Sequence, residues 1–543
     1  MQKKHFKLSL WTGLSLLLCS QSFAAVVPAG TKLAKNQVLN IDNQSEITSL
    51  DPNKSSDNLA NNILFDLYEP LIVNNSEGKY VPGAATSWDV SKDGLTYTFH
   101  LRKNALWSDG KPVEAEDFAY SFRRLVDPKT AATYAFMLNM VKNANKILEG
   151  KLKPESLGVK ALDKHTFQVT LDTPTPYFLG LVAIPQLVPL RKDLIEKHGD
   201  QWVQAQYLVT NGAYVLKEWK VGDKISIVRN KKYWDDKNTV IENVNFLVVT
   251  DKTASLRLYQ AGQIDWTYGL PPGQSAKLKK EYPNEIHASP SLSTHYFMFN
   301  TKVPALSDVR VRKALSMTVD RNALAKHIMD KGEKAHYDLP PLGIANYSPY
   351  EPEWAKWSSE KRITEAKKLY AEAGFSEKNP LKIKYSLDVN DTSKKYATAI
   401  ASMWEKSLGA KVELISSEWK VHLTNLHEKK YEVTLSLWGA DFNDPYNFAV
   451  LIEGKNPQNQ TNYASKRFDD LLAATNLELN LDKRKILMKE ALKMALEDYP
   501  VAPIASGTSM RLIKPYVKGA SFKNPMDIHL RKDLYIVSHD GNS

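Results

Sequence analysis

The sequence predicts a mixed α/β fold, because patterns typical of strands and of helices alternate along its 543 residues. The strand patterns repeat apolar residues at period two, and the helix patterns repeat them at spacings of three and four. The chain has no internal repeat and no long Gly/Ser segment. Since 43% of the residues are hydrophobic, several cores can form, and we expect several domains that pack together.

Strands are predicted where apolar and polar residues alternate without interruption. In the first such segment Leu, Tyr, Phe and Leu alternate with Thr, Thr and His. One face of such a strand packs on a core while the other meets solvent. The pattern predicts strands at residues 95–101, 166–171, 225–228 and 431–437.

Helices are predicted where the apolar residues gather on one face. Residues 363–373 have such a face and are followed by Gly374, a common helix stop. Residues 394–408 have a wider apolar face and end at Gly409. Residues 486–496 form a third amphipathic helix.

The amino-terminal 24 residues are typical of a secretory signal peptide. A basic head with three lysines precedes an apolar stretch at residues 8–18, and Ser22-Phe23-Ala24 places small residues where cleavage needs them. The apolar stretch is too short for a membrane span, which needs about 20 residues. We therefore expect cleavage after Ala24 and a soluble mature protein outside the cytoplasm.

The only cysteine, Cys19, lies inside this predicted signal peptide. Leu18 before it is bulkier than a lipid-attachment site prefers, so we expect no lipid anchor. The mature chain would hold no disulfide, no thiolate nucleophile and no cysteine metal site. Loss of three lysines lowers the net charge from +11 to +8, and the charges are mixed along the chain, which disfavours nucleic-acid binding.

The sequence lacks the common catalytic motifs, including the phosphate loop, the dinucleotide fingerprint, the nucleophile elbow and the paired-histidine zinc motif. His422 and His427 are five residues apart, which does not place them on one helix face. We expect no metal and no cofactor. The pattern favours a binding protein over an enzyme, although a pair of catalytic carboxylates stays an open alternative.

The stretch Trp438-Gly439-Ala440-Asp441 follows the predicted strand at residues 431–437. It places an aromatic ring, a bare backbone and a carboxylate at a strand end, where ligands bind in α/β folds. A carboxylate there can hold a ligand cation. The alternative is a simple turn, because the following residues include the turn formers Asn, Asp and Pro.

Five motifs lie in order along the chain: Ser49-Leu50-Asp51-Pro52, Trp107-Ser108-Asp109-Gly110, Asn211-Gly212-Ala213-Tyr214, Asp308-Val309-Arg310-Val311-Arg312 and Trp438-Gly439-Ala440-Asp441. With these motifs the chain resembles the periplasmic oligopeptide-binding proteins of ABC importers, extracellular solute-binding family 5. The resemblance covers essentially the whole mature chain. Within the family, the chain looks most like the general oligopeptide receptors and the murein-peptide-binding paralogues.

The resemblance implies a two-lobe fold of the type II periplasmic-binding-protein class, with a hinge and an additional third domain. Lobe I would comprise residues 25–68, 192–294 and 509–543. The additional domain would comprise residues 69–191, and lobe II residues 295–508. Two lobes on a hinge can close over a ligand.

The resemblance also implies how a ligand is held. An extended peptide would lie between the lobes and pair its backbone with both, while hydrated pockets take its side chains. Asp441 matches the acid that pairs with the peptide's α-ammonium, and Gly439 would let the peptide backbone approach closely. The other implied ligand-binding residues are Trp438, Trp419, Tyr134, Ser56, Asp57 and Asn58. For Trp419 and Tyr134 the alternative interpretation is a core aromatic.

The chain departs from the oligopeptide receptors at several positions, and the comparison implies that it keeps their amino-end site but not their carboxyl-end site. Leu435 replaces an arginine, Ser393 a histidine and Ser56 a glutamate, and Ala-Ser-Gly at residues 505–507 replaces an aromatic run. Our hypothesis is a ligand with a free amine and a different far end, such as a longer, modified or cell-wall peptide. Alternative carboxylate partners are Lys394, Arg310 and His295, which also fit ordinary surface or hinge roles.

We therefore expect a periplasmic receptor that delivers oligopeptides to an inner-membrane ABC permease and works as a monomer. The alternatives are a periplasmic peptidase or other hydrolase, and a receptor for another amine-bearing solute such as a cell-wall peptide.

Overall fold

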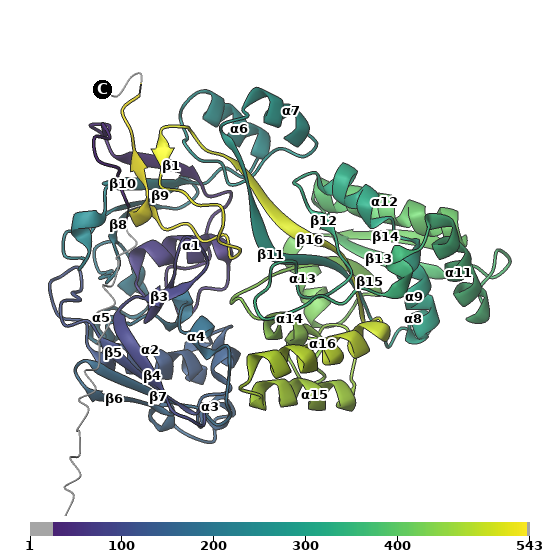
Figure 1. Cartoon of the computed structure of the whole chain (residues 1–543), viewed down its shortest axis with the longest axis horizontal. Helices are drawn as coiled ribbons and strands as arrows, with labels where there is room; N and C mark the ends of the chain where they lie inside the picture. The colour runs from purple at the N-terminus through teal and green to yellow at the C-terminus, as the bar shows by residue number, and fades with distance from the viewer. Residues whose placement is uncertain (1–24, 540–543) are drawn as a thin grey trace, which may run out of the picture.

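The computed structural model describes residues 25–539, which form two lobes joined by two long strands (Figure 1). The predicted signal peptide, including Cys19, lies outside the described residues. Among the described residues, no helix combines the length and the apolar character that a membrane crossing requires.

Lobe I is built on a four-stranded sheet in the order β1-β10-β9-β8. β1 is parallel to β10, and the other pairs are antiparallel. Its strands are β1 (Val38–Asp42), β8 (Tyr214–Lys220), β9 (Lys224–Arg229) and β10 (Asn243–Leu247), and its helices include α1 (Asn58–Leu67), α6 (Lys252–Gln260) and α7 (Ser275–Glu281). Two short strand pairs flank it: β2 (Ile72–Asn74) with β3 (Tyr80–Pro82), and β17 (Val517–Lys518) with β18 (Tyr535–Ile536).

The additional domain lies beside lobe I and carries a second antiparallel sheet in the order β4-β5-β7-β6 (Figure 1). Its buried side chains belong to the same hydrophobic cluster as those of lobe I, so the two parts share a core. Its elements are β4 (Ala85–Val90), β5 (Thr96–Leu101), α2 (Ala115–Val126), α3 (Ala144–Leu148), β6 (Val159–Asp163), β7 (Thr166–Thr170) and α4 (Phe178–Leu181), followed by α5 (Lys192–His198).

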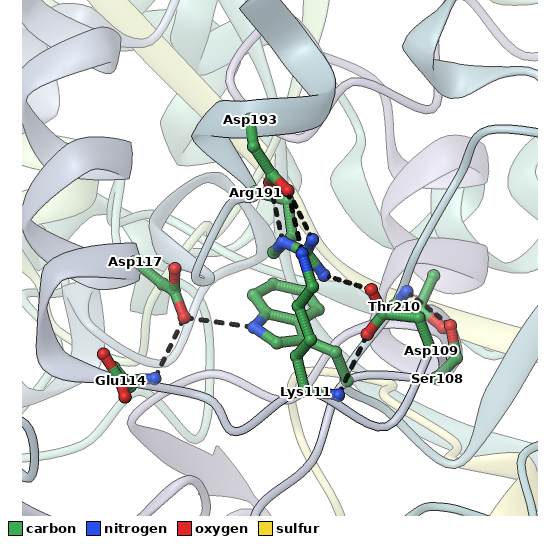
Figure 2. A network of polar contacts seen from close by, with 9 residues as sticks. Ser108, Asp109, Lys111, Glu114, Asp117, Arg191, Asp193 and Thr210 are labelled. Atoms are coloured by element: carbon green, nitrogen blue, oxygen red, sulfur yellow. Dashed lines mark hydrogen bonds and ion pairs between the residues drawn. The ribbon is translucent and has the colours of Figure 1, made fainter. Parts of the chain in front are cut away.

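The motif at residues 107–110 joins three parts of this region (Figure 2). The Trp107 indole nitrogen donates to Asp117 in the first turn of α2 (3.0 Å). Asp109 accepts a hydrogen bond from Arg191, which precedes α5 (2.7 Å). Burial raises the pKa of Asp117 to about 6, which its hydrogen bonds partly offset. The motif therefore joins α2 to the segment that precedes α5. Its residues do not line the cavity between the lobes.

Lobe II contains a six-stranded mixed sheet in the order β12-β16-β11-β15-β13-β14. Two separate apolar clusters pack on its opposite faces, because alternate residues of β11 point to opposite sides. Its strands are β11 (Ile286–Phe299), β12 (Lys334–Ala335), β13 (Lys382–Asp388), β14 (Lys411–Ser417), β15 (Val433–Gly439) and β16 (Val501–Leu512). Its helices are α8 (Pro304–Ser307), α9 (Val309–Thr318), α10 (Arg321–Ala323), η7 (Leu324–Met329), α11 (Ser359–Glu372), α12 (Asp391–Leu408), α13 (Trp419–His427), α14 (Tyr446–Ala449), α15 (Lys466–Leu477) and α16 (Leu481–Glu497).

The two long strands, β11 and β16, form the hinge. They pair in antiparallel fashion from Ile286 opposite Leu512 near lobe I to Met298 opposite Val501 within lobe II. The register shifts midway, between the strand halves that belong to each lobe. Such a β-bulge bends a strand pair locally, which suits a hinge position.

The sequence-predicted elements are confirmed. The four period-two segments fall in β5, β7, β9 and β15, and the three helix patterns fall in α11, α12 and α16. Gly409 caps α12 in the left-handed conformation, with φ +67°. The two-lobe class is also confirmed, while the residue boundaries predicted for the lobes and the additional domain stay predictions.

Candidate ligand-binding cleft

A cavity of about 430 Å³ lies between the lobes at the hinge. Its size falls in the range of small-ligand sites in proteins. Lobe I, the hinge strands and lobe II all contribute to its wall. Representative lining residues are Asn58, Asn61 and Trp266 from lobe I, His295 and Ser509 from the hinge, and Lys331, Gly439 and Asp441 from lobe II.

Asp441 lies just beyond the end of β15 and lines this cavity. Two neutral side chains donate to its carboxylate: the Tyr134 hydroxyl to Oδ1 (3.3 Å) and the Asn447 amide nitrogen to Oδ2 (3.3 Å). The Asp441 backbone N–H in turn donates to Asn447 Oδ1 (3.2 Å). Asn447, which lies in α14, therefore fixes both the backbone and the side chain of Asp441.

The carboxylate of Asp441 lacks a cationic partner. Within residues 25–539, no Lys, Arg or His nitrogen lies within 4.0 Å of it. Burial raises the pKa of Asp441 to about 6, and the hydrogen bonds from Asn447 and Tyr134 only partly oppose this. A desolvated acid of this kind favours the approach of a cation, which would restore its ionised state.

Trp438 and Gly439 support the same wall in different ways. The Trp438 indole nitrogen donates to Asn447 Oδ1 (2.9 Å), which turns the amide nitrogen of Asn447 toward Asp441. Gly439 lines the cavity, and a Cβ at this position would meet only Asn58 Nδ2, at 3.9 Å. The backbone of Gly439 is thus open to a second backbone. Trp438 is outside the cavity lining, so its role is to position Asn447.

Tyr134 reaches Asp441 from the additional domain. Its ring is half-buried against the core that this domain shares with lobe I. Burial first, and then the charge of Asp441, raise the pKa of the Tyr134 hydroxyl far above its usual range. The hydroxyl therefore stays protonated and donates. The two sequence interpretations of Tyr134, core aromatic and cleft residue, both describe part of its environment.

The α1 segment at residues 56–58 contributes one residue to the cavity lining. Asn58 lines the cavity, whereas Ser56 is exposed outside the lining. The Asp57 carboxylate caps α1 by accepting from the Ala60 N–H (2.8 Å) and also bonds Thr48. Asp57 therefore shapes the start of α1, and any pairing of this segment with a ligand backbone stays a prediction.

Trp419 is 54% exposed at the start of α13 and lies outside the cavity lining. Its ring stacks on that of His422, with centroids 6.1 Å apart. The core-aromatic interpretation of Trp419 is wrong, because the residue is exposed to solvent. His422 itself is buried, and among the described residues no group of three potential metal ligands is found.

The carboxylate partners proposed from sequence are placed very differently. Lys394 is exposed on α12, and Arg310 pairs with Asp308 (2.6 Å). His295 does line the cavity, but burial, and then the charge of Lys331, lower its pKa to about 4, so it is neutral near pH 7. Lys331 also lines the cavity, and the sequence did not single it out, because a lone Lys-Gly pair has no distinctive pattern.

The segment that follows Asp441 docks on the additional domain. The Tyr177 ring stacks between Phe442 (centroids 5.0 Å apart) and Tyr446 (4.6 Å). Beneath them, Asp444 and Arg484 form a buried two-fold ion pair (2.7 and 2.8 Å). These contacts close the cleft around the Asp441 end of the cavity.

The family model described as "Bacterial extracellular solute-binding proteins, family 5 Middle" matches residues 79–460. The periplasmic oligopeptide-binding protein OppA of Salmonella typhimurium is 41% identical over 528 residues, which are 97% of this chain and 97% of that protein. A structure of Haemophilus influenzae OppA in complex with the peptide RPPGFSPFR is 37% identical, with a TM-score of 0.84 over 93% of this chain and all of that one.

Two solved structures of the murein tripeptide binding protein MppA, the first from Escherichia coli, allow a further comparison. One gives a TM-score of 0.86 at 38% identity over 94% of this chain and 100% of that chain. The structure titled as its unliganded open form gives a TM-score of 0.78 at the same identity, over 94% and 99%. The conformation described here is therefore less like the open form.

Proposed function

Because this chain belongs to the bacterial extracellular solute-binding proteins of family 5, we propose that it is a receptor for oligopeptides with a free amino terminus. Family membership also decides between the two classes that the sequence left open: the protein is a solute-binding receptor and not an enzyme. The peptide occupies the cavity between the lobes in extended form.

The observation that carries the proposal is the unpaired carboxylate of Asp441. It lines a cavity, it accepts only from neutral groups, and its pKa of about 6 reflects burial without a counter-ion. An α-ammonium bound there supplies the missing charge and up to three N–H donors. Removing one member of such a buried pair costs on the order of 3–5 kcal/mol.

The rest of the peptide is held through its backbone. Gly439 and the amide of Asn58 both line the cavity and approach each other closely, one from each lobe. Backbone pairing of this kind accepts many side chains, because the bonds do not depend on sequence. Ser56, Asp57 and Trp419 lie outside the cavity lining, so any part they take in binding would pass through water.

The relatives are described as periplasmic, and we assign the same compartment to this protein after removal of residues 1–24. In that compartment it delivers peptide to an inner-membrane ABC permease and acts as a monomer. Similarity to MppA, which is named for murein peptides, makes a cell-wall peptide a specific candidate ligand.

The test is calorimetry with matched peptides that differ only at the amino terminus. We expect a free-amine peptide to bind and its N-acetyl form to bind at least about 100-fold more weakly, as expected for loss of about 3 kcal/mol. Asp441→Asn should lose this preference by weakening the free-amine form alone. Asp200→Asn, which removes an exposed acid, serves as the control.

Native mass spectrometry of the protein as purified identifies any co-purified ligand directly. Equal binding of free and acetylated peptides by the unmodified protein would rule out the role of Asp441. Absence of binding to every peptide in a mixed pool, with the protein folded, would overturn the receptor assignment itself.

A further inference from the structure

The motif at residues 49–52 begins a chain of hydrogen bonds that leads to the cleft. The Asp51 carboxylate binds the guanidinium group of Arg124 in α2 through two hydrogen bonds (2.9 and 2.6 Å). Arg124 also donates to Asn53 Oδ1 (2.8 Å), and the Asn53 amide nitrogen donates to the carbonyl oxygen of Gln186 (3.0 Å). Asn53 and Gln186 are buried, and Gln186 lines the cavity. The chain therefore fixes Gln186 at the cavity wall from behind.

Gln186 in turn fixes the orientation of Asn61 on α1. The Gln186 amide nitrogen donates to the backbone carbonyl oxygen of Ser55 (3.0 Å) and to Asn61 Oδ1 (3.1 Å). The Ser55 hydroxyl donates to the same Asn61 oxygen (3.0 Å). Because a backbone carbonyl can only accept, the Gln186 atom beside it must be the amide nitrogen, and the Asn61 atom that receives this nitrogen must be the oxygen.

The amide nitrogen of Asn61 is the atom left for a ligand. Asn61 lines the cavity, and among residues 25–539 its Nδ2 donates to no protein acceptor. An amide nitrogen carries two N–H donors and accepts no hydrogen bond. Asn61 therefore offers donors to the cavity, while its oxygen is used twice inside the protein.

Two further amides lie on the same face of α1. Asn58, Asn61 and Asn62 are spaced by three and four residues, which places them side by side on a helix, and all three line the cavity. Asn58 Nδ2 lies 3.9 Å from the position that a Cβ on Gly439 would take. Gly439 is two residues before Asp441, the proposed amine partner. The amide face of α1 therefore borders the part of the cavity that receives the first residues of a peptide.

We propose that Asn61 is a specificity-determining residue, which donates a hydrogen bond to an oxygen on a ligand side chain near the amino terminus, and that Gln186 is its positioning residue. The inference rests on the proposed function, because it concerns the side chains of a peptide held by its amine at Asp441. The receptor prefers side chains that carry a carbonyl, carboxylate or sulfoxide oxygen over apolar side chains of similar shape.

The preference arises because the donor is fixed in advance. An apolar side chain that covers the Asn61 amide nitrogen removes water from it and supplies no hydrogen bond, whereas an oxygen acceptor replaces the lost water. The amide cannot turn over to present its oxygen without losing the hydrogen bonds from Gln186 and Ser55. The site therefore selects side chains by their polarity and not by their shape.

The test compares free-amine tetrapeptides that carry methionine or methionine sulfoxide at the first, second or third position. Oxidation of the thioether nearly preserves the shape of the side chain and adds a polar, uncharged oxygen acceptor. At one position, we expect the sulfoxide peptide to bind about fivefold more tightly in calorimetry, as expected for one added hydrogen bond. Asn61→Leu should abolish this difference between the two peptides.

Asn61→Asp tests whether the site is a donor. This variant keeps the oxygen that Gln186 and Ser55 bind and replaces the amide nitrogen with a second oxygen, which repels an acceptor. The sulfoxide peptide should then bind more weakly than the methionine peptide. Because both peptides have the same amine, their ratio is independent of any general effect of the added charge on amine binding.

Gln186→Met tests the positioning role, because it removes a hydrogen bond that holds the Asn61 oxygen. It should reduce the ratio of the two affinities, whereas a purely structural role would weaken both peptides equally. Asn104→Leu, which changes an exposed amide, is the control and should keep the ratio.

Two outcomes overturn the inference: equal affinity for methionine and sulfoxide at all three positions, or an unchanged preference in Asn61→Leu. An Asn61→Asp variant that still prefers the sulfoxide also overturns it, because the site would then not act as a donor. If none of the free-amine peptides binds the folded protein, the proposed function fails and the inference fails with it.

Discussion

Asp441 carries its carboxylate in the cleft wall, where only the hydroxyl of Tyr134 and the amide of Asn447 donate to it. Both donors are neutral, and together they orient the acid without compensating its charge. Trp438 fixes Asn447 in turn. The arrangement keeps a desolvated acid aimed at the cavity, which is a suitable receptor for an ammonium group and a poor one for a neutral ligand.

The first prediction at this scale concerns pH. The raised pKa of Asp441, about 6, means that the free protein takes up a proton as the pH falls through that value. An ammonium ligand needs the ionised acid, so its affinity should fall about tenfold between pH 7.5 and pH 5, where about nine-tenths of the acid is protonated. Calorimetry at these two pH values measures the change.

The control for the pH prediction is Asp441→Asn, which should bind weakly with little dependence on pH in this range. If the peptide affinity of Asp441→Asn depended on pH as strongly as that of the unmodified protein, Asp441 would not be the group that binds the ammonium.

The stability of the ligand-free fold should change with pH in the opposite direction to the peptide affinity. Because the folded pKa lies above the unfolded value, the contribution of this group to stability is present below about pH 4 and is lost as the pH rises to about 6.

At the scale of elements, β15 ends at the cleft and the chain then turns onto the additional domain through α14. Tyr177 stacks between Phe442 and Tyr446 and ties this turn to α4. The same turn contains Asp441, so the acid and the contact that closes the cleft lie on one short segment. Closure and amine binding should therefore depend on each other.

We predict that Tyr177→Ala weakens peptide affinity by roughly 5- to 100-fold, because two aromatic pairs of about 0.5–1.5 kcal/mol each are lost from the closed state. Tyr177→Phe retains the stacking and should change affinity little. Calorimetry with one free-amine peptide compares the three proteins. An unchanged affinity in the alanine variant, with the fold intact by circular dichroism, would show that this contact does not assist closure.

The hinge provides a second element-scale prediction. A Cβ at Gly507 would lie 1.9 Å from Ser293 Oγ and 3.3 Å from the Ser293 carbonyl oxygen. Gly507→Ala should therefore destabilise the protein by about 1–3 kcal/mol, as is usual for overpacking, and lower its melting temperature. Adding Ser293→Ala removes the closest atom and should restore part of the loss. No restoration would place the strain in the backbone instead.

At the scale of the whole molecule, the two lobes are joined by the hinge strands β11 and β16 and also meet across the cleft. The contacts between them include the Tyr134–Asp441 hydrogen bond and the Ser275–Asp330 pair. The greater similarity to one MppA structure than to its open form agrees with a largely closed arrangement. A ligand that contacts both lobes stabilises the closed arrangement.

We predict that a free-amine peptide reduces the radius of gyration in small-angle scattering and raises the melting temperature. At a peptide concentration about 100-fold above Kd, the added stability should be about 2.7 kcal/mol. The same peptide should have little effect on Asp441→Asn at that concentration. Compaction of the mutant equal to that of the unmodified protein would mean that closure does not require this acid.

The sequence by itself predicted several strands and helices, the family and the acid at the end of β15. Period-two and helical patterns predicted β5, β15 and α12 correctly because they depend on neighbouring residues and on burial of one face. The motif at residues 107–110, which also carried the family resemblance, joins α2 to the segment before α5.

Only the tertiary structure decided how the site is completed. Tyr134 reaches Asp441 from the additional domain, Asp57 serves as a helix cap, and Trp419 is left exposed. Lys331 lines the same cavity as Asp441, and Lys252 of the other lobe lies near it. Local patterns record which face of a segment is buried, but the charge balance of a cleft depends on groups hundreds of residues apart, and only folding brings those groups together.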